Sequence, residues 1–532
     1  MTAVSQPPAP TTDFRTAEPR LRRWSIAIAQ RLQGLTESQL NGMIWLSSLA
    51  MCLFLLGSSR TSITGTMNIV ENWGAVERVA LWQDFLTPVI PRYTLPTGVI
   101  AWGFRVAMLI AFLAQAGAFL VVMKSPNPSL GRWLIGPIGA HIIMMFLMVP
   151  SNSDVFFYEA VGDLAARGFN PYVHELMDFP DHPLIPWNYW IDIGTVYGPL
   201  WVQYSRIVMM VAGPDPVLAT LLQKLLVGLV TFALVGVVYW FAKRLSGRQS
   251  LATAAGVLVA WQPNMIIETS GQVHNDPHTV LLATIGLALV ILGGIAGIRA
   301  GIILVTLSMM IKFITIPLLG VLAIVRIVDG HNPNPVRRII GNWLLDGAAI
   351  VAVILAAFLP FWEGYETIEE MLAEPGRLYT HPIWRLIQSA MGFLLPAGAS
   401  DVWNAISRPF LQAATLALFI GVIVFQGIRL WNDRRAAATA PEEMTRSGNL
   451  PWWTRHVLYA WMIMFLVLAY VPVNSHPWYW VWPVAAVGLV IAFDFRSRHE
   501  SWSVALLPTW FWIYLWGNAL LTLMYHTRIA RY

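Results

Sequence analysis

Residues 98–123 read GVIAWGFRVAMLIAFLAQAGAFLVVM, and Arg105 is the only charged residue in this stretch. A helix needs about 20 predominantly apolar residues to cross the hydrocarbon core of a bilayer. An apolar run of this length is typical of a membrane-spanning helix. The stretch therefore predicts that part of the chain lies in lipid.

The composition extends this prediction to the whole chain of 532 residues. Apolar residues make up 56% of it and charged residues 12%, with a mean hydropathy of +0.58. A soluble globular domain carries about 25% charged residues, so a soluble protein is excluded. The net charge of +5 is spread over short loops without a continuous basic stripe, which argues against a nucleic-acid partner. The single cysteine, Cys52, excludes an intramolecular disulfide.

Apolar runs long enough to cross a membrane recur along the chain. Those counted as single spans lie near residues 41–57, 98–123, 133–150, 216–242, 251–268, 278–298, 343–361, 404–430, 456–472, 478–494 and 503–525. A further apolar region, 300–327, needs separate treatment because Lys312 and Pro317 interrupt it.

Region 300–327 is either one long span or two short helices that meet at Lys312. Arg299 precedes the region and Arg326, Arg337 and Arg338 mark its other end. Basic residues gather on the cytoplasmic side of membrane proteins, so a hairpin with Lys312 at its outer tip fits better. The total is then about thirteen spans, and an odd number puts the two termini on opposite sides.

The sequence thus predicts an all-α polytopic protein of the cell membrane. Residues 1–40 are expected to form a cytoplasmic N-terminal tail, because they are basic and show no signal-peptide cleavage site. Residues 41–532 are expected to form the transmembrane domain, with long outer loops at 58–97, 151–215 and 362–403. Long loops are usually functional or disordered, so the working face is expected outside.

One apolar segment, 198–213, is not counted as a span. Counting it would place the basic residues Lys243, Arg244 and Arg248 on the outer side, against the positive-inside rule. We therefore expect an interfacial or re-entrant helix on the outer face.

The strongest candidate for chemistry is Asp154, which follows the apolar run 133–150 directly. A carboxylate at the boundary between hydrocarbon and water can deprotonate a hydroxyl while a lipid-linked substrate enters sideways. The alternative is that Asp154 only caps a helix over 155–167. Spacing alone leaves both interpretations open.

Two outer turns carry further polar groups. His274, Asn275 and Asp276 offer donors and acceptors suited to sugar hydroxyls or a phosphate, although Asp276 could simply cap the next span. His476 lies with Asn474 in a second turn, and a lone histidine of this kind is more often structural.

Lys312 is the most informative cation, because charges within apolar segments are usually functional. Its alternatives are an internal ion pair, with Glu268 as the expected partner, and snorkelling to the interface. Lys224 is a rival for the same role. The chain has no glycine-rich phosphate loop and no Asp-X-Asp pair, so a nucleotide donor is not expected; neither a cofactor nor a metal ion is required.

In order, these segments resemble the GT-C superfamily of membrane glycosyltransferases, and within it the polyprenyl-phosphomannose-dependent α-1,6-mannosyltransferases of actinobacteria. The resembling pieces are Pro150 to Tyr158, Gly168 to Tyr172, Tyr197 to Leu200, Trp261 to Pro263, His274 to Asp276, Lys312, and Trp478 to Trp482. Two differences leave the sugar and the acceptor open: Ser153 stands where the family carries a basic residue, and Trp187 to Val196 lengthens the approach to Tyr197.

The resemblance implies transfer of a sugar, mannose in the first instance, from a polyprenyl phosphate to a lipid-linked glycan. By position Asp154 resembles the general base and Lys312 the contact to the donor phosphate. His274, Asn275 and Asp276 resemble a polar turn on the sugar side. The full set of candidate substrate-binding residues is Tyr158, Asn170, Tyr172, Tyr197, His274, Asn275, Asp276 and His476.

Two classes of function fit such a chain. A phosphate leaves without a strong acid, so one carboxylate and one cation suffice for an inverting transferase. A transporter or flippase of a lipid-linked sugar would instead be expected to carry its working charges near the membrane midplane. The candidates gather at the outer ends of spans, which favours the enzyme.

Overall fold

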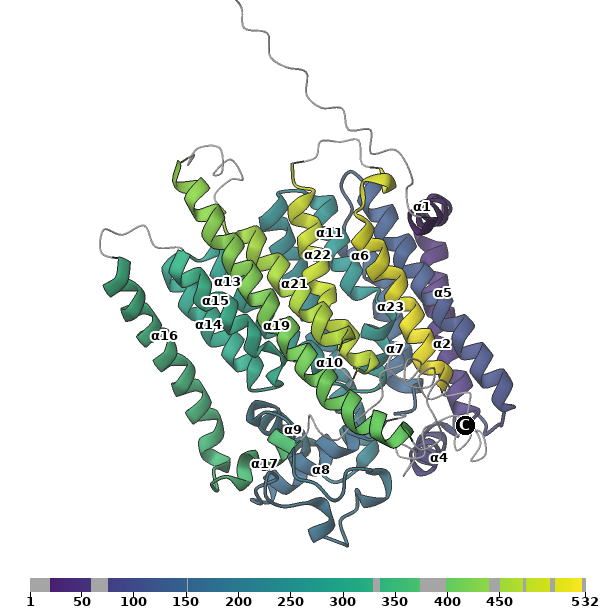
Figure 1. Cartoon of the computed structure of the whole chain (residues 1–532). Coiled ribbons are helices and arrows are strands. Elements are labelled where there is room, and N and C mark those ends of the chain that lie inside the picture. Colours follow the sequence, from purple (N-terminus) through teal and green to yellow (C-terminus); the bar gives the residue numbers. More distant parts are fainter. Residues whose placement is uncertain are drawn as a thin grey trace, which may run out of the picture.

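The computed structural model describes residues 20–58, 75–150, 152–328, 335–373, 399–439, 450–471, 475–497 and 503–528. Helices account for nearly all regular structure in these ranges, which contain no strand (Figure 1). The predicted all-α polytopic class is therefore confirmed. Residues 1–19 of the expected tail, Asn474, and most of 58–74 and 374–398 in two expected outer loops lie outside the described ranges.

A helix overlaps each of the predicted apolar runs. These helices are α2 (Glu37–Leu56), α5 (Thr97–Lys124), α7 (Ile135–Leu147), α10 (Pro216–Ser246), α11 (Gln249–Ala260), α13 (Asp276–Leu292), α14 (Gly294–Met309), α15 (Ile316–Val328), α16 (Pro335–Phe358), α19 (Ala399–Thr439), α21 (Thr454–Tyr470), α22 (Trp482–Asp494) and α23 (Thr509–Arg528). Among the described residues, 7 helices are long and apolar enough to cross a membrane, or up to 8 if a bent pair forms one span. About thirteen crossings therefore stay a prediction.

Helix α10 shows how local sequence sets the ends of these helices. The Asp215 side chain accepts hydrogen bonds from the backbone N–H groups of Val217 and Leu218, at 2.9 and 3.0 Å. Pro216 occupies the first helical position, where no N–H is needed. The helix ends at Gly247, whose φ of 69° is the left-handed conformation that favours glycine.

The predicted run 251–268 is bent in the structure. Helix α11 ends before Trp261 and Gln262, and the chain continues as α12 (Pro263–Ile266) and η4 (Ile267–Gly271) at 55° to it. Gln262 stabilises the restart because its side chain accepts a hydrogen bond from the Met265 N–H at 2.8 Å. The bend displaces the end of the run from the line of a straight helix.

Region 300–327 forms two helices rather than one. Helices α13 and α14 pack as an antiparallel pair in which the backbones of Gly286 and Gly301 come close enough to exclude any side chain at either position. The chain then breaks between α14 and α15, and Lys312 in the break lies 2.8 Å from Asp276 at the start of α13. The predicted meeting of two helices at Lys312 is confirmed, and the single long span is wrong.

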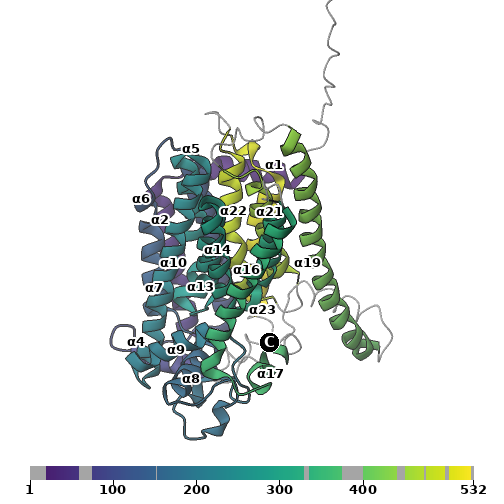
Figure 2. The ribbon, with the colours of Figure 1, turned by 90° about the vertical axis from the view of Figure 1, so that its left-hand side faces the viewer.

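The described parts of the three long loops gather at one end of the bundle (Figures 1 and 2). They form α4 (Ala75–Leu86), α8 (Asp154–Ala166), α9 (Pro199–Ala212) and α17 (Glu366–Ala373). Helix α9 covers the segment predicted to be interfacial or re-entrant, and it packs on α8 below the bundle. At the opposite end lies α1 (Arg20–Leu32), within the expected tail.

This arrangement allows a direct test of orientation. In a Cys52→Ala background, we expect Glu369→Cys in α17 to react with an impermeant maleimide on intact cells. Lys124→Cys, at the opposite end of α5, should react only after permeabilisation, because the positive-inside rule places that end in the cytoplasm. Both parent side chains are exposed, so access of the maleimide to the two cysteines depends only on the side of the membrane on which each lies. Reversed labelling would contradict the predicted topology.

Candidate functional site

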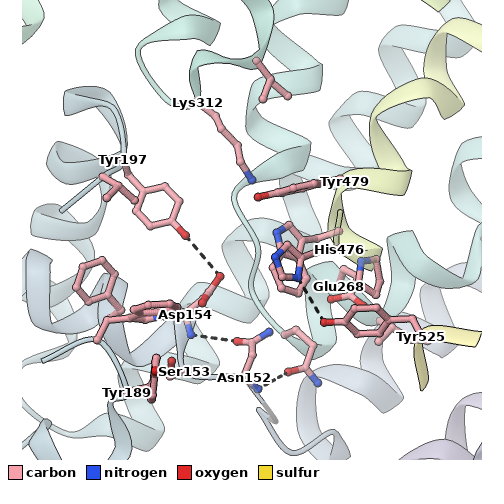
Figure 3. A pocket seen from close by; sticks show the side chains of 18 of the residues that line it. Asn152, Ser153, Asp154, Tyr189, Tyr197, Glu268, Lys312, His476, Tyr479 and Tyr525 are labelled. Atoms are coloured by element: carbon pink, nitrogen blue, oxygen red, sulfur yellow. Dashed lines mark hydrogen bonds between the residues drawn. The ribbon is translucent and has the colours of Figure 1, made fainter. Parts of the chain in front are cut away.

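A cavity of about 420 Å³ lies at the end of the bundle that carries α8 and α9 (Figure 3). Its walls come from the start of α8, the segment before α9, the break between α14 and α15, η4, and η9 (Pro477–Val481). The polar side chains among the lining residues are Asn152, Ser153, Asp154, Tyr189, Tyr197, Glu268, Gln272, Lys312, His476, Tyr479 and Tyr525. The predicted base and the predicted phosphate contact thus face the same space.

Asp154 is the first residue of α8, and the helix cap is Ser153, with no side-chain capping bond. The capping interpretation of Asp154 is therefore wrong. The Tyr197 hydroxyl lies 3.5 Å from its Oδ2 atom, at the long limit of a hydrogen bond. Burial raises the pKa of Asp154 to about 6, even though the nearby positive charge of Lys312 opposes this shift.

Local contacts aim the Asp154 carboxylate at the cavity. The Asp154 backbone N–H donates to Asn152 Oδ1 at 3.2 Å, which shapes the turn into α8. The next two residues, Val155 and Phe156, pack in an apolar cluster with Val227. With those two side chains anchored in the core, Asp154 is left on the side of α8 that borders the cavity.

The segment Tyr197-Gly198-Pro199 joins two walls of the cavity. The Gly198 N–H donates to the Ile311 carbonyl at 3.1 Å, so the start of α9 contacts the α14–α15 break directly. A Cβ atom at position 198 would lie 2.1 Å from the Met310 carbonyl oxygen, so only glycine fits there. This close approach holds Tyr197 and Lys312 around one space.

Lys312 forms an ion pair with Asp276, with 2.8 Å between Nζ and Oδ1. The expectation that Glu268 would be the partner is wrong, because α13 packs on α14 and its first residue, Asp276, therefore lies beside the break. The ammonium also lies over the rings of Tyr479 and Trp482, 4.7 and 5.4 Å from their centroids. Asp276 and the two aromatic rings thus hold the Lys312 ammonium in place, and the side chain also lines the cavity.

Lys224, the rival cation, is fully buried and is not among the residues that line the cavity. Its ammonium donates to the Met148 carbonyl at 2.6 Å and lies 4.2 Å from the centroid of the Trp82 ring. Because it is fully buried, it does not snorkel to a surface. Its position supports the α7 end that leads into the Asp154 turn.

The turn His274-Asn275-Asp276 lies behind the cavity wall. All three side chains are buried and none lines the cavity. Asp276 begins α13 without a side-chain capping bond, so its capping interpretation is wrong, and it serves as the partner of Lys312. His274 stacks on Trp478, with ring centroids 4.0 Å apart, and contacts Asp154.

Some of the remaining predicted substrate-side residues line the cavity, and the others lie behind its wall. Tyr197 and His476 line the cavity, whereas Tyr158, Asn170 and Tyr172 support it from behind. Tyr158 donates to the Tyr197 hydroxyl at 3.3 Å, and Tyr172 donates to the Tyr197 carbonyl at 2.8 Å. Asn170 donates to the Phe361 carbonyl at 2.7 Å and to Glu363 Oε1 at 2.9 Å, and the second bond ties two of the long loops together.

Several lining residues were not predicted as site residues, among them Glu268, Gln272 and Tyr525. Glu268 carried a usable signal, because a carboxylate inside an apolar run is a functional candidate by default. Tyr525 carried none, since aromatic residues at span ends are common. Within the described ranges, no three His, Cys, Asp or Glu side chains are placed to hold a metal ion.

The fold and the site define a polytopic membrane protein with an acidic, aromatic-lined cavity at one end of its helix bundle. Residues 70–328 match the family described as alpha-(1->6)-mannopyranosyltransferase, N-terminal domain. Asp154 and Lys312 both fall within this match, and His476 falls outside it. No solved structure matches the chain.

Two curated relatives carry a similar name. The chain is 26% identical over 386 residues to alpha-(1->6)-mannopyranosyltransferase A of Mycobacterium tuberculosis, covering 69% of this chain and 66% of the relative. It is 23% identical over 333 residues to the protein of that name from Corynebacterium glutamicum, covering 59% and 67%. The match thus spans just under two thirds of the first relative's length. The predicted resemblance is confirmed: the chain is related to these actinobacterial proteins.

Proposed function

We propose that this protein transfers mannose, with inversion, from a polyprenyl phosphate to a hydroxyl of a lipid-linked glycan on the outer face of the cell membrane. The observation that carries the proposal is the placement of Asp154 and Lys312 in the wall of one cavity. The names of the relatives supply the sugar. The donor, the acceptor and the face of the membrane are part of the proposal.

Asp154 acts as the general base in this proposal. The acceptor oxygen attacks the anomeric carbon, and its proton passes to the Asp154 carboxylate as the new C–O bond forms. A base works best when its pKa lies just below the working pH. Burial raises the pKa of Asp154 to about 6, which is close to that optimum.

Lys312 stabilises the leaving group. The bond between the anomeric carbon and the phosphate oxygen breaks, and its electron pair stays on the phosphate, where negative charge grows. An ammonium has three N–H donors, and Asp276 takes one of them. The others remain for a phosphate in the cavity, where a fixed cation stabilises developing charge.

The apolar part of the wall suits the lipid portion of the donor. Leu55, Phe104, Ile267, Ile311 and Phe313 line the cavity beside the polar groups. Apolar lining with a few placed polar groups is the usual composition of a small-molecule site. A polyprenyl chain needs such a surface next to its phosphate.

A transporter of a lipid-linked sugar remains the alternative. The cavity is lined by the start of α8 and the segment before α9, and these helices lie at one end of the bundle (Figure 1), whereas transporters place their sites near the midplane. A labelled polyprenyl-phosphate mannose with an oligosaccharide acceptor, given to the detergent-purified protein, separates the two functions. A labelled, elongated acceptor supports the transferase; intact donor with no product contradicts it.

The same assay predicts a pH dependence. Because Asp154 must be deprotonated to act and its pKa is raised to about 6, we expect kcat to rise between about pH 5 and pH 7 and then level off. Initial rates at saturating donor and acceptor, measured across this range, check the expectation. A profile that is flat across this range, or that has levelled off by pH 5, would contradict a general base with a raised pKa.

A further inference from the structure

His274 lies between two carboxyl groups. Its Nδ1 atom is 3.5 Å from Asp154 Oδ2, and its Nε2 atom is 3.3 Å from Glu268 Oε2. Nδ1 is buried and makes no hydrogen bond with the described residues. Its side chain is 1% exposed. Burial lowers the pKa of His274 well below its usual range, and the charge of Lys312 lowers it further. The imidazole is therefore neutral, with one proton to place on one of its two nitrogens.

Asn152 decides which nitrogen holds the proton. A backbone N–H can only donate, and the Asp154 N–H points at Asn152 Oδ1 at 3.2 Å, as Figure 3 shows. This fixes the orientation of the Asn152 amide, so its Nδ2 donor faces His274 Nε2 at 2.8 Å. This contact is shorter than the one from Nε2 to Glu268. Nε2 therefore accepts, and the proton lies on Nδ1, which faces Asp154.

The imidazole is held rigidly in this position. Its ring stacks on Trp478 at 4.0 Å and 15°, and Trp478 stacks in turn on His476 at 4.2 Å and 8°. The preceding residue, Val273, has a φ of 66°, which is strained for a β-branched side chain. Such strain persists where surrounding contacts require it, and it is concentrated at functional sites.

We propose that His274 is a positioning residue for Asp154: its buried Nδ1–H, 3.5 Å from the carboxylate and without another hydrogen-bond partner in the described part of the chain, is available to donate to Asp154, and Asn152 selects the tautomer that makes this possible. The proposal rests on the function proposed above and deepens it. A donor aimed at a carboxylate favours the charged form. His274 thus opposes the effect of burial and keeps the base available near neutral pH.

Other groups also act on the Asp154 carboxylate and must be kept constant in any test. Tyr197 and Trp190 donate to it, and the charges of Lys312 and Asp276 act on it in opposite directions. The test therefore changes only position 274. It compares two amide side chains that differ in where the N–H can be placed.

In His274→Asn, the amide nitrogen occupies the place of Nδ1 and can still donate to Asp154. In His274→Gln, the amide nitrogen reaches the place of Nε2 instead. We expect His274→Gln to lower kcat by about 10-fold or more and to move the acidic limb of the kcat profile up by about 1 pH unit, as expected when a charged group loses its neighbouring donor. His274→Asn should keep kcat and the position of the acidic limb close to those of the parent protein. Equal losses in the two variants with an unmoved limb would show that the ring is only structural.

A second measurement does not depend on activity. Nitrogen NMR of the ¹⁵N-histidine-labelled protein distinguishes the two neutral tautomers, and the signal missing in His274→Asn assigns His274. We expect the Nδ1–H tautomer in the parent protein and its loss in Asn152→Leu. An Nε2–H tautomer would overturn the inference even if Asp154 is the base. Conversely, if Asp154→Asn is active and the parent protein has the Nδ1–H tautomer, Asp154 is not the base, although the geometry at His274 is as described.

Discussion

Asp154→Asn is expected to lower kcat by about 10²- to 10⁴-fold, the usual cost of removing a general base. The amide keeps the shape of the carboxylate and still offers an oxygen to Tyr197, but it cannot take the proton of the acceptor. Initial rates with labelled donor at saturating concentrations measure the effect. The limb of the kcat profile near pH 6 should disappear from the residual activity.

The fold should tolerate this change, because no capping bond of α8 uses the Asp154 side chain. A matched control lies in the same helix. Asp163 bonds His182 at 2.8 Å and Arg167 at 2.7 Å and is not among the residues that line the cavity, so Asp163→Asn should turn over nearly normally. Parent-like turnover in Asp154→Asn would instead point to Glu268, the other carboxylate in the cavity wall.

Much of the scaffold could be predicted from the sequence, because lipid imposes a simple rule on it. Every apolar run had to become a helix, since a backbone in hydrocarbon must satisfy its own hydrogen bonds. The break at Lys312 followed from a charge inside an apolar region together with the loop charges on both sides. Asp154 stood out for the same reason, as a carboxylate directly after a span.

The arrangement within the site could not be predicted, because it depends on contacts between distant segments. The sequence suggested Glu268 as the ion-pair partner of Lys312, but the packing of α13 on α14 brings Asp276, at the start of α13, beside the break. The polar turn His274-Asn275-Asp276 was expected to meet substrate and instead lies behind the wall. No periodicity separates a residue that lines a cavity from one that supports it.

The second large effect concerns Lys312. We expect Lys312→Met to lower kcat/KM for the donor by about 10²- to 10³-fold, comparable with removing one group that stabilises developing charge. The methionine suits an apolar wall next to Met309 and Met310. Lys312→Arg should recover part of the activity, because it restores the positive charge with different geometry. Donor titrations in detergent measure both parameters.

The ion pair with Asp276 complicates Lys312→Met alone. Asp276 is 1% exposed, and removing its partner leaves a buried carboxylate uncompensated, which typically costs about 3 to 5 kcal/mol. Low activity of this variant could therefore come from partial unfolding. The double variant Lys312→Met with Asp276→Asn removes both charges, and the asparagine oxygen can still accept the hydrogen bond from the Trp482 indole.

The double variant separates the two roles of Lys312. Thermal unfolding followed by fluorescence should show that it is more stable than Lys312→Met alone, because no buried charge is left unpaired. If Lys312 binds the donor phosphate, donor kcat/KM stays low although stability is restored, since no cation faces the cavity at this position. Recovery of parent-like donor kinetics in the double variant would show that the pair only holds the α14–α15 break to α13, and the phosphate contact would then have to be sought elsewhere in the wall.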